Sequence, residues 1–77
     1  MEIKKNKLTG GFYSIVKKGD QHYYIDLSFT LDHGPEVMAF PCDENGKVSD
    51  YMEVYANWPG EVTESALKKE IESFLAE

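Results

Sequence analysis

The chain has 77 residues, of which 42% are hydrophobic and 13% aromatic, and it carries a net charge of −6. This composition is too apolar for a disordered chain, and the length predicts one small domain over residues 1–77 with a modest core. The acidic balance and the absence of arginine argue against direct nucleic-acid binding, because arginine is the usual residue for bidentate contacts to phosphate and guanine.

The charge distribution, the cysteine content and the lack of long apolar segments indicate the compartment in which the protein is expected. Residues 1–18 carry five lysines and one acid, whereas residues 19–77 carry three lysines and thirteen acids. Cys42 is the only cysteine, so no disulfide can form within the chain. The first residues lack the apolar segment of a signal peptide, and no apolar run approaches the length of a membrane span. We therefore expect a cytoplasmic protein with no membrane contact, and its small size suggests a bacterial or phage source.

The N-terminal part of the chain is basic and then rich in β-forming residues. Residues 1–7 read as a frayed arm or as the start of the first strand, which we place over residues 8–18. Gly10 and Gly11 inside this strand indicate either a bulge or a close approach of the backbone to a neighbour. They lack the spacing of a phosphate-binding loop, and no helix follows them.

Residues 23–31 hold the clearest periodic pattern in the chain. Apolar side chains at every second position alternate with Tyr24, Asp26, Ser28 and Thr30. Successive side chains of a strand point to opposite faces, so the pattern predicts a half-buried central strand over residues 22–31. A third, shorter strand is expected over residues 36–42.

A hairpin and a fourth strand are expected next. Asn45 and Gly46 are the residues favoured where a tight turn needs two positive-φ positions. The fourth strand is placed over residues 48–57, and Trp58, Pro59 and Gly60 end it. Trp58 is expected to cover the core where the chain crosses to the helix, and stacking of a ligand on its ring is the alternative.

The last segment predicts a helix that begins after the N-cap Thr63. Its apolar stripe recurs at helical spacing and contains Ala66, Leu67, Ile71, Phe74 and Leu75. A helix of this length is not stable alone in water, so it must pack against the sheet. The expected fold is α+β: a four-stranded antiparallel β-meander with one C-terminal α-helix packed on one face, in the order ββββα.

The sheet face that the helix leaves uncovered is the candidate contact surface. If the helix covers the side of Ile25 and Leu27, the other side presents tyrosines and two acids. Tyrosine gives contact area at little entropy cost, and acids beside aromatic rings suit a basic protein partner. The structural alternatives are ordinary cross-strand packing and burial of this face in a homodimer. The candidate contact residues are Tyr24, Asp26, Tyr51, Glu53 and Tyr55.

No pattern in the sequence predicts a catalytic, metal or cofactor site. His22, His33 and Cys42 lie at separate turns or strand ends without the paired spacing of a zinc site. Cys42 and His33 as nucleophile and base lack a local signature, and a lone cysteine is usually a small buried hydrophobe. Asp26 and Glu53 on one open face would not be desolvated enough for acid–base chemistry.

Three functions remain open on these observations. The leading expectation is a small binding or accessory protein, not an enzyme, that acts through protein–protein contact on the tyrosine-bearing face. The second is an acidic mimic or inhibitor of a nucleic-acid-binding protein, motivated by the thirteen acids of residues 19–77. The third is a small ligand-binding domain, which would need a concave pocket with convergent polar groups.

Overall fold

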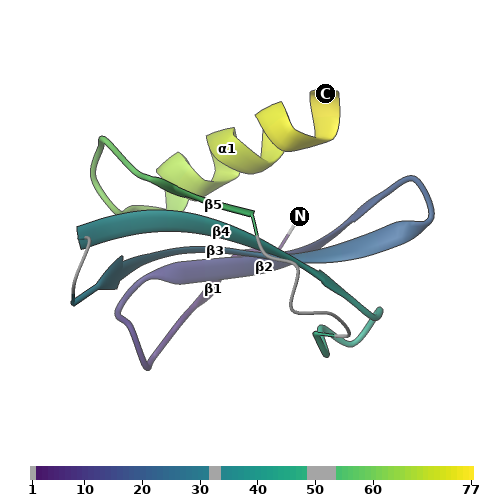
Figure 1. Ribbon diagram of the computed structural model, residues 1–77, viewed down its shortest axis with the longest axis horizontal. Coiled ribbons are helices and arrows are strands. Elements are labelled where there is room, and N and C mark those ends of the chain that lie inside the picture. Colours follow the sequence, from purple (N-terminus) through teal and green to yellow (C-terminus); the bar gives the residue numbers. More distant parts are fainter. Residues whose placement is uncertain (1, 32–33, 49–53) are drawn as a thin grey trace.

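The computed structural model describes residues 2–31, 34–48 and 54–77, with only the backbone of Thr30, Val54 and Tyr55. In this part of the chain one antiparallel sheet has its strands in sequence order, and a single helix covers one of its faces (Figure 1). This arrangement confirms the α+β prediction. The elements are β1 (Lys4–Lys5), β2 (Phe12–Lys18), β3 (Gln21–Thr30), β4 (Gly34–Cys42), β5 (Val54–Asn57) and α1 (Glu64–Ala76).

The central strand is β3, which pairs along its length with β2 on one side and β4 on the other. Its alternation has the predicted effect, because Ile25 and Leu27 are 2% and 0% exposed beneath the helix. The pattern continues past the core, however. Phe29 is 54% exposed, and Leu31 is fully exposed beyond the end of β3, so periodicity alone overstates the length of the buried face.

The expected first strand over residues 8–18 begins only at Phe12, as β2, and a separate short strand, β1, precedes it. Lys4 and Lys5 of β1 pair with Tyr13 and Phe12, and the loop of residues 6–11 connects the two strands. The Asn6 N–H donates to the Gly11 carbonyl at 2.8 Å, and the Gly10 N–H donates to the Asn6 carbonyl at 2.8 Å. Gly10 has φ of 77°, which favours glycine and ends the extended conformation.

Gly11 explains why this loop needs a second glycine. A Cβ atom at Gly11 would collide with the Leu27 carbonyl oxygen and with Ser28 of β3. The paired glycines therefore mark a close backbone approach, which was one of the two predicted readings, and not a bulge within a strand.

The loop of residues 43–47 lies where the hairpin was predicted but has a different geometry. Cys42 and Val48 form a bridge, and within the loop the Asp43 N–H donates to the Lys47 carbonyl at 2.9 Å. Gly46 has φ of 87°, whereas no described non-glycine residue has a positive φ, so the expected conformation of Asn45 is wrong. The Asp43 carboxylate accepts hydrogen bonds from the backbone N–H groups of Asn45 at 2.8 Å and Lys47 at 2.9 Å, which stabilises this wider loop.

The fourth predicted strand is described only in part. β5 pairs with β4 between Glu36 and Ala39, and residues 49–53 lie outside the described residues. Five residues separate Val48 from Val54, whereas two separate Ala39 from Cys42. The bridge at Val48 and the β5 ladder therefore have different registers on β4.

The predicted helix is confirmed. The Thr63 hydroxyl accepts a hydrogen bond of 3.1 Å from the Ala66 N–H, as expected for an N-cap. Leu67 and Ile71 are fully buried against Val16, Ile25 and Leu27, and partly buried side chains surround this cluster. Trp58 is one of those surrounding side chains, which bears out its predicted place at the edge of the core.

Candidate binding site

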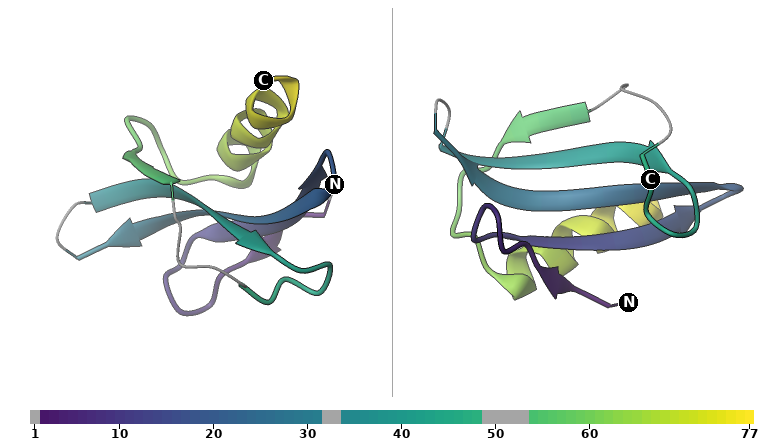
Figure 2. Two further views of the ribbon diagram at one scale, coloured as in Figure 1. Left: turned by 45° about the vertical axis from the view of Figure 1, so that its right-hand side comes forward. Right: turned by 90° about the horizontal axis from the view of Figure 1, so that it is seen from below.

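The sheet has an open face on the side opposite α1, and two loops lie on that side. Figure 1 shows α1 above the sheet, with the loop after β4 and the loop between β1 and β2 below it; the right-hand view in Figure 2 looks at the open face. The strand registers place Tyr13 and Ile15 of β2, Tyr24 of β3 and Phe40 of β4 on this face. We define the open face by these residues together with Asp26, Ser28 and Met38.

Aromatic rings from three strands lie next to one another on the open face. The rings of Tyr13 and Tyr24 are stacked, with centroids 5.0 Å apart and an interplanar angle of 19°. Tyr24 and Phe40 follow at 6.2 Å with a tilt of 55°. Such aromatic pairs across strands stabilise the sheet.

Asp26 lies on the open face but is not available for contact. It is 3% exposed, because the loop of residues 6–11 covers it. The Asn6 side-chain amide donates to its carboxylate at 2.8 Å, and the Ser28 hydroxyl donates to its other oxygen. Thr9 joins through a hydrogen bond of 2.6 Å between its hydroxyl and that of Ser28. These contacts give the buried carboxylate the partners that burial of a charge requires.

Tyr24 is held as a neutral phenol by its surroundings. Burial, the nearby charge of Asp26, the neighbouring Tyr13 and a hydrogen bond to Asp26 raise the pKa of Tyr24 to about 12. The ring therefore offers an uncharged aromatic surface with a polar tip at physiological pH.

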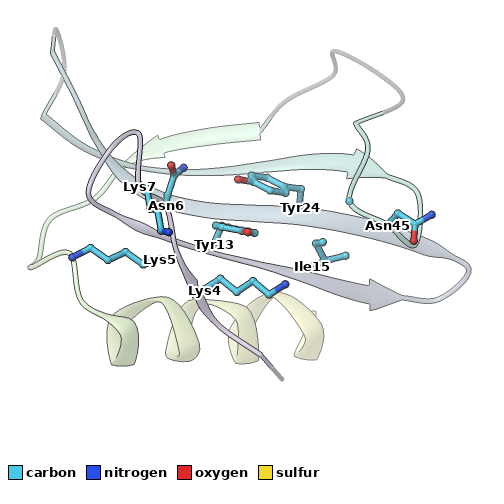
Figure 3. A pocket seen from close by; sticks show the side chains of 9 residues that line it. Lys4, Lys5, Asn6, Lys7, Tyr13, Ile15, Tyr24 and Asn45 are labelled. Carbon is cyan, nitrogen blue, oxygen red and sulfur yellow. The ribbon is translucent and has the colours of Figure 1, made fainter.

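A groove of about 470 Å³ opens on this face between the two loops (Figure 3). Tyr13, Ile15 and Tyr24 form its floor, residues 4–7 form one wall, and Asn45 and Gly46 form the other. The second wall packs tightly on the floor, because a Cβ atom at Gly46 would collide with the Ile15 side chain.

The charged groups that line the groove are all lysines. Lys4, Lys5 and Lys7 are exposed, and no acid is among the described lining residues. Lys4 and Lys5 extend in opposite directions from β1 (Figure 3), and the register places Lys4 with Tyr13 on the open face and Lys5 with Phe12 on the helix side. The Lys4 ammonium also lies 3.3 Å from the Glu2 carboxylate, and both side chains of this pair are largely exposed.

The predicted contact residues have different positions in the structure. Tyr24 lines the groove, and Asp26 is buried beside it. Tyr51 and Glu53 lie outside the described residues, and of Tyr55 only the backbone is described, where it pairs with Met38.

Several groove residues were not indicated by the sequence pattern. Tyr13 lies on the open face, whereas Phe12 lies on the helix side of β2. Residues 4–7, which form the lysine-bearing wall, were expected as a frayed arm or as the start of the first strand. The only signal in the sequence for this wall was a basic stretch that two glycines separate from a β-forming run. The loop of residues 6–11 that folds this stretch onto the sheet depends on contacts to β3.

The other candidate chemistry is not assembled in the described residues. Cys42 is buried, and burial followed by the charge of Asp43 raises its pKa, so its thiol is a poor nucleophile. His33 lies outside the described residues, and no group of three metal-ligating side chains is found among the others. The Trp58 ring lines a second groove of about 370 Å³ while its Nε1–H donates to the Glu61 carbonyl at 3.1 Å.

The described helix α1 is too short to cross a membrane. No protein-family model, curated protein or solved structure matches the chain. Inferences about function therefore depend on the geometry of the open face.

Proposed function

We propose that this chain is a protein-binding module that holds a short segment of its partner in the groove on the open face. The observation that supports the proposal is the groove itself, in which the stacked rings of Tyr13 and Tyr24 form a floor between two loop walls. Its volume of about 470 Å³ suits a few side chains of an extended segment.

The physical character of the floor supports binding. Tyrosine rings already stacked on each other lose little conformational freedom when a partner covers them. The neutral Tyr24 phenol and the amides of Asn6 and Asn45 place polar groups around this apolar floor. An apolar centre with a polar rim is typical of protein interfaces.

Selection of peptides from a phage-displayed random library on the wild-type protein tests this function. We expect the enriched peptides to bind in solution and to shift the backbone amide resonances of Tyr13, Ile15 and Tyr24. Peptides that shift only residues of β5 or α1, or a failure to enrich any peptide, would contradict the proposal.

A pair of variants makes the test specific. Tyr13→Ser removes one ring of the floor and should weaken binding of the selected peptides about tenfold or more, as truncation of an aromatic anchor does. Phe29→Ser is the control, because it removes an aromatic ring that is 54% exposed and does not line the groove. Thermal unfolding of both variants shows whether a loss of binding reflects a loss of the folded state.

A further inference from the structure

We infer that the groove selects an acidic segment of another protein, whose carboxylates face the lysine wall and whose apolar or aromatic side chain lies on Tyr13 and Tyr24. This inference rests on the proposed function and names the chemistry of the partner. It differs from the expectation of a basic partner, because Asp26 is buried and the accessible charges beside the floor are lysines.

The lysine wall has the spacing needed to meet an extended acidic segment. Lys4, beside Tyr13 on the open face, and Lys7, in the loop that follows β1, are three positions apart and exposed, whereas the register turns Lys5 toward the helix side. Alternate side chains of an extended segment point the same way, so one set can meet the lysines while the other set lies on the floor. The Lys4 ammonium already pairs with one carboxylate, that of Glu2, at 3.3 Å.

Three acids near the groove, Asp26, Asp43 and Glu2, already have partners within the chain. The Asp26 carboxylate is held by Asn6 and Ser28. The Asp43 carboxylate accepts from the backbone of its own loop, and these hydrogen bonds hold its pKa below the usual range. The Glu2–Lys4 pair is exposed, and exposed pairs of this kind are easily exchanged for another carboxylate.

The net charge of −6 would repel an acidic segment, but this repulsion is weak at the groove. The Debye length is about 8 Å at physiological ionic strength, so acids elsewhere on the surface are largely screened from a segment in the groove. The charges beside the segment then decide the selectivity, and on the open face these are Lys4 and Lys7. We expect the preference for acidic segments to narrow as salt is raised.

Three labelled heptapeptides test this selectivity by fluorescence anisotropy. They alternate phenylalanine with glutamate, glutamine or lysine, so that only the charge differs. We expect the glutamate peptide to bind about tenfold more tightly than the glutamine peptide, as exposed ion pairs with Lys4 and Lys7 would provide, and the lysine peptide to bind most weakly.

Two charge-matched variants locate the effect. The triple variant K4Q/K5Q/K7Q should bind the glutamate peptide no better than the glutamine peptide, with the glutamine peptide unaffected. The control K17Q/K68Q/K69Q changes the net charge equally at exposed lysines outside this groove and should retain the preference.

The outcomes separate this inference from the proposed function. Equal binding of the glutamate and glutamine peptides, with shifts in the groove, would overturn the acidic preference and leave the binding module intact. Failure of all three peptides to shift groove resonances would count against both. Self-association of the chain alone that K4Q/K5Q/K7Q abolishes, measured by sedimentation, would show that the occupant is a second copy and would also overturn the inference.

Discussion

Asn6 lies in the loop after β1 and Asp26 lies in β3, and the Asn6 side-chain amide donates a hydrogen bond of 2.8 Å to the Asp26 carboxylate. This contact fastens the loop of residues 6–11 to the central strand. It buries the one described acid of the predicted contact set, and it positions the adjacent Lys4, Lys5 and Lys7 along the groove. One hydrogen bond therefore links the stability of the loop to the charge of the candidate site.

Asn6→Ala should lower the free energy of unfolding by about 1–3 kcal/mol, because it leaves a buried carboxylate without one of its donors. Urea unfolding measures this change. Asn45→Ala is the control, since its side chain is exposed, and it should change the free energy by less than about 0.5 kcal/mol. Equal effects of the two substitutions would show that the Asn6–Asp26 contact does not stabilise the fold.

Gly11→Ala should destabilise the protein by about 1–3 kcal/mol, the usual cost of forcing extra atoms into a closely packed site. The new methyl group would collide with the backbone of β3 at Leu27 and Ser28, which cannot move without disturbing the sheet. Gly60→Ala is the matched control, because its Cβ would meet the Trp58 ring no closer than 3.4 Å. Thermal melts in which both variants unfold at the same temperature would contradict the close approach at Gly11.

Tyr24→Phe should make the stability less sensitive to alkaline pH. The pKa of Tyr24 is raised from 10.0 to about 12 on folding, so the folded state retains the proton more strongly. The resulting stabilisation is fully present below pH 10 and is lost as pH rises toward 12. Between these values the wild type should lose stability more steeply than the variant.

Two measurements follow this titration. Urea unfolding at several pH values compares the slopes, and absorbance of the phenolate near 295 nm reports ionisation of the tyrosines in the folded protein. The signal that appears near pH 12 should be missing from Tyr24→Phe. A variant with an unchanged slope and an unchanged final ionisation step would show that Tyr24 is not the shifted group.

Leu67→Ala should cost about 2–5 kcal/mol, because it leaves a cavity where α1 meets the sheet. Leu67 is fully buried in contact with the core cluster, whereas Leu75 on the same helix is 40% exposed. Leu75→Ala should therefore cost much less. If urea melts gave similar losses for the two, the docking of α1 through Leu67 would be wrong.

The helix and the central strand were predictable because their signals are local. Thr63 supplies its own N-cap, and the alternation around Ile25 and Leu27 identifies a half-buried strand without knowledge of its neighbours. The position of the loop at residues 43–47 could also be predicted from local sequence, whereas its geometry could not. The side chain of Asp43 competes for the loop amides and changes the turn that Asn45 and Gly46 favour in isolation.

The composition of the open face was only partly predictable. Tyr24 was identified, but the burial of Asp26 depends on Asn6, which is distant in the sequence. Phe40 faces Tyr24 only because β4 has the register that it does on β3. The acidic-mimic alternative and the contributions of Tyr51 and Glu53 stay predictions.

By itself, the sequence determined the α+β class, the β3 strand and the helix, because hydrophobic periodicity and capping act between residues a few positions apart. Only the tertiary structure decided what lies on the open face. A turn at Gly10 and Gly11 folds a basic arm back across β2, hides Asp26 and places lysines beside two stacked tyrosines. The physical reason is that this arrangement depends on hydrogen bonds and packing between residues far apart in the chain, which local sequence patterns do not report.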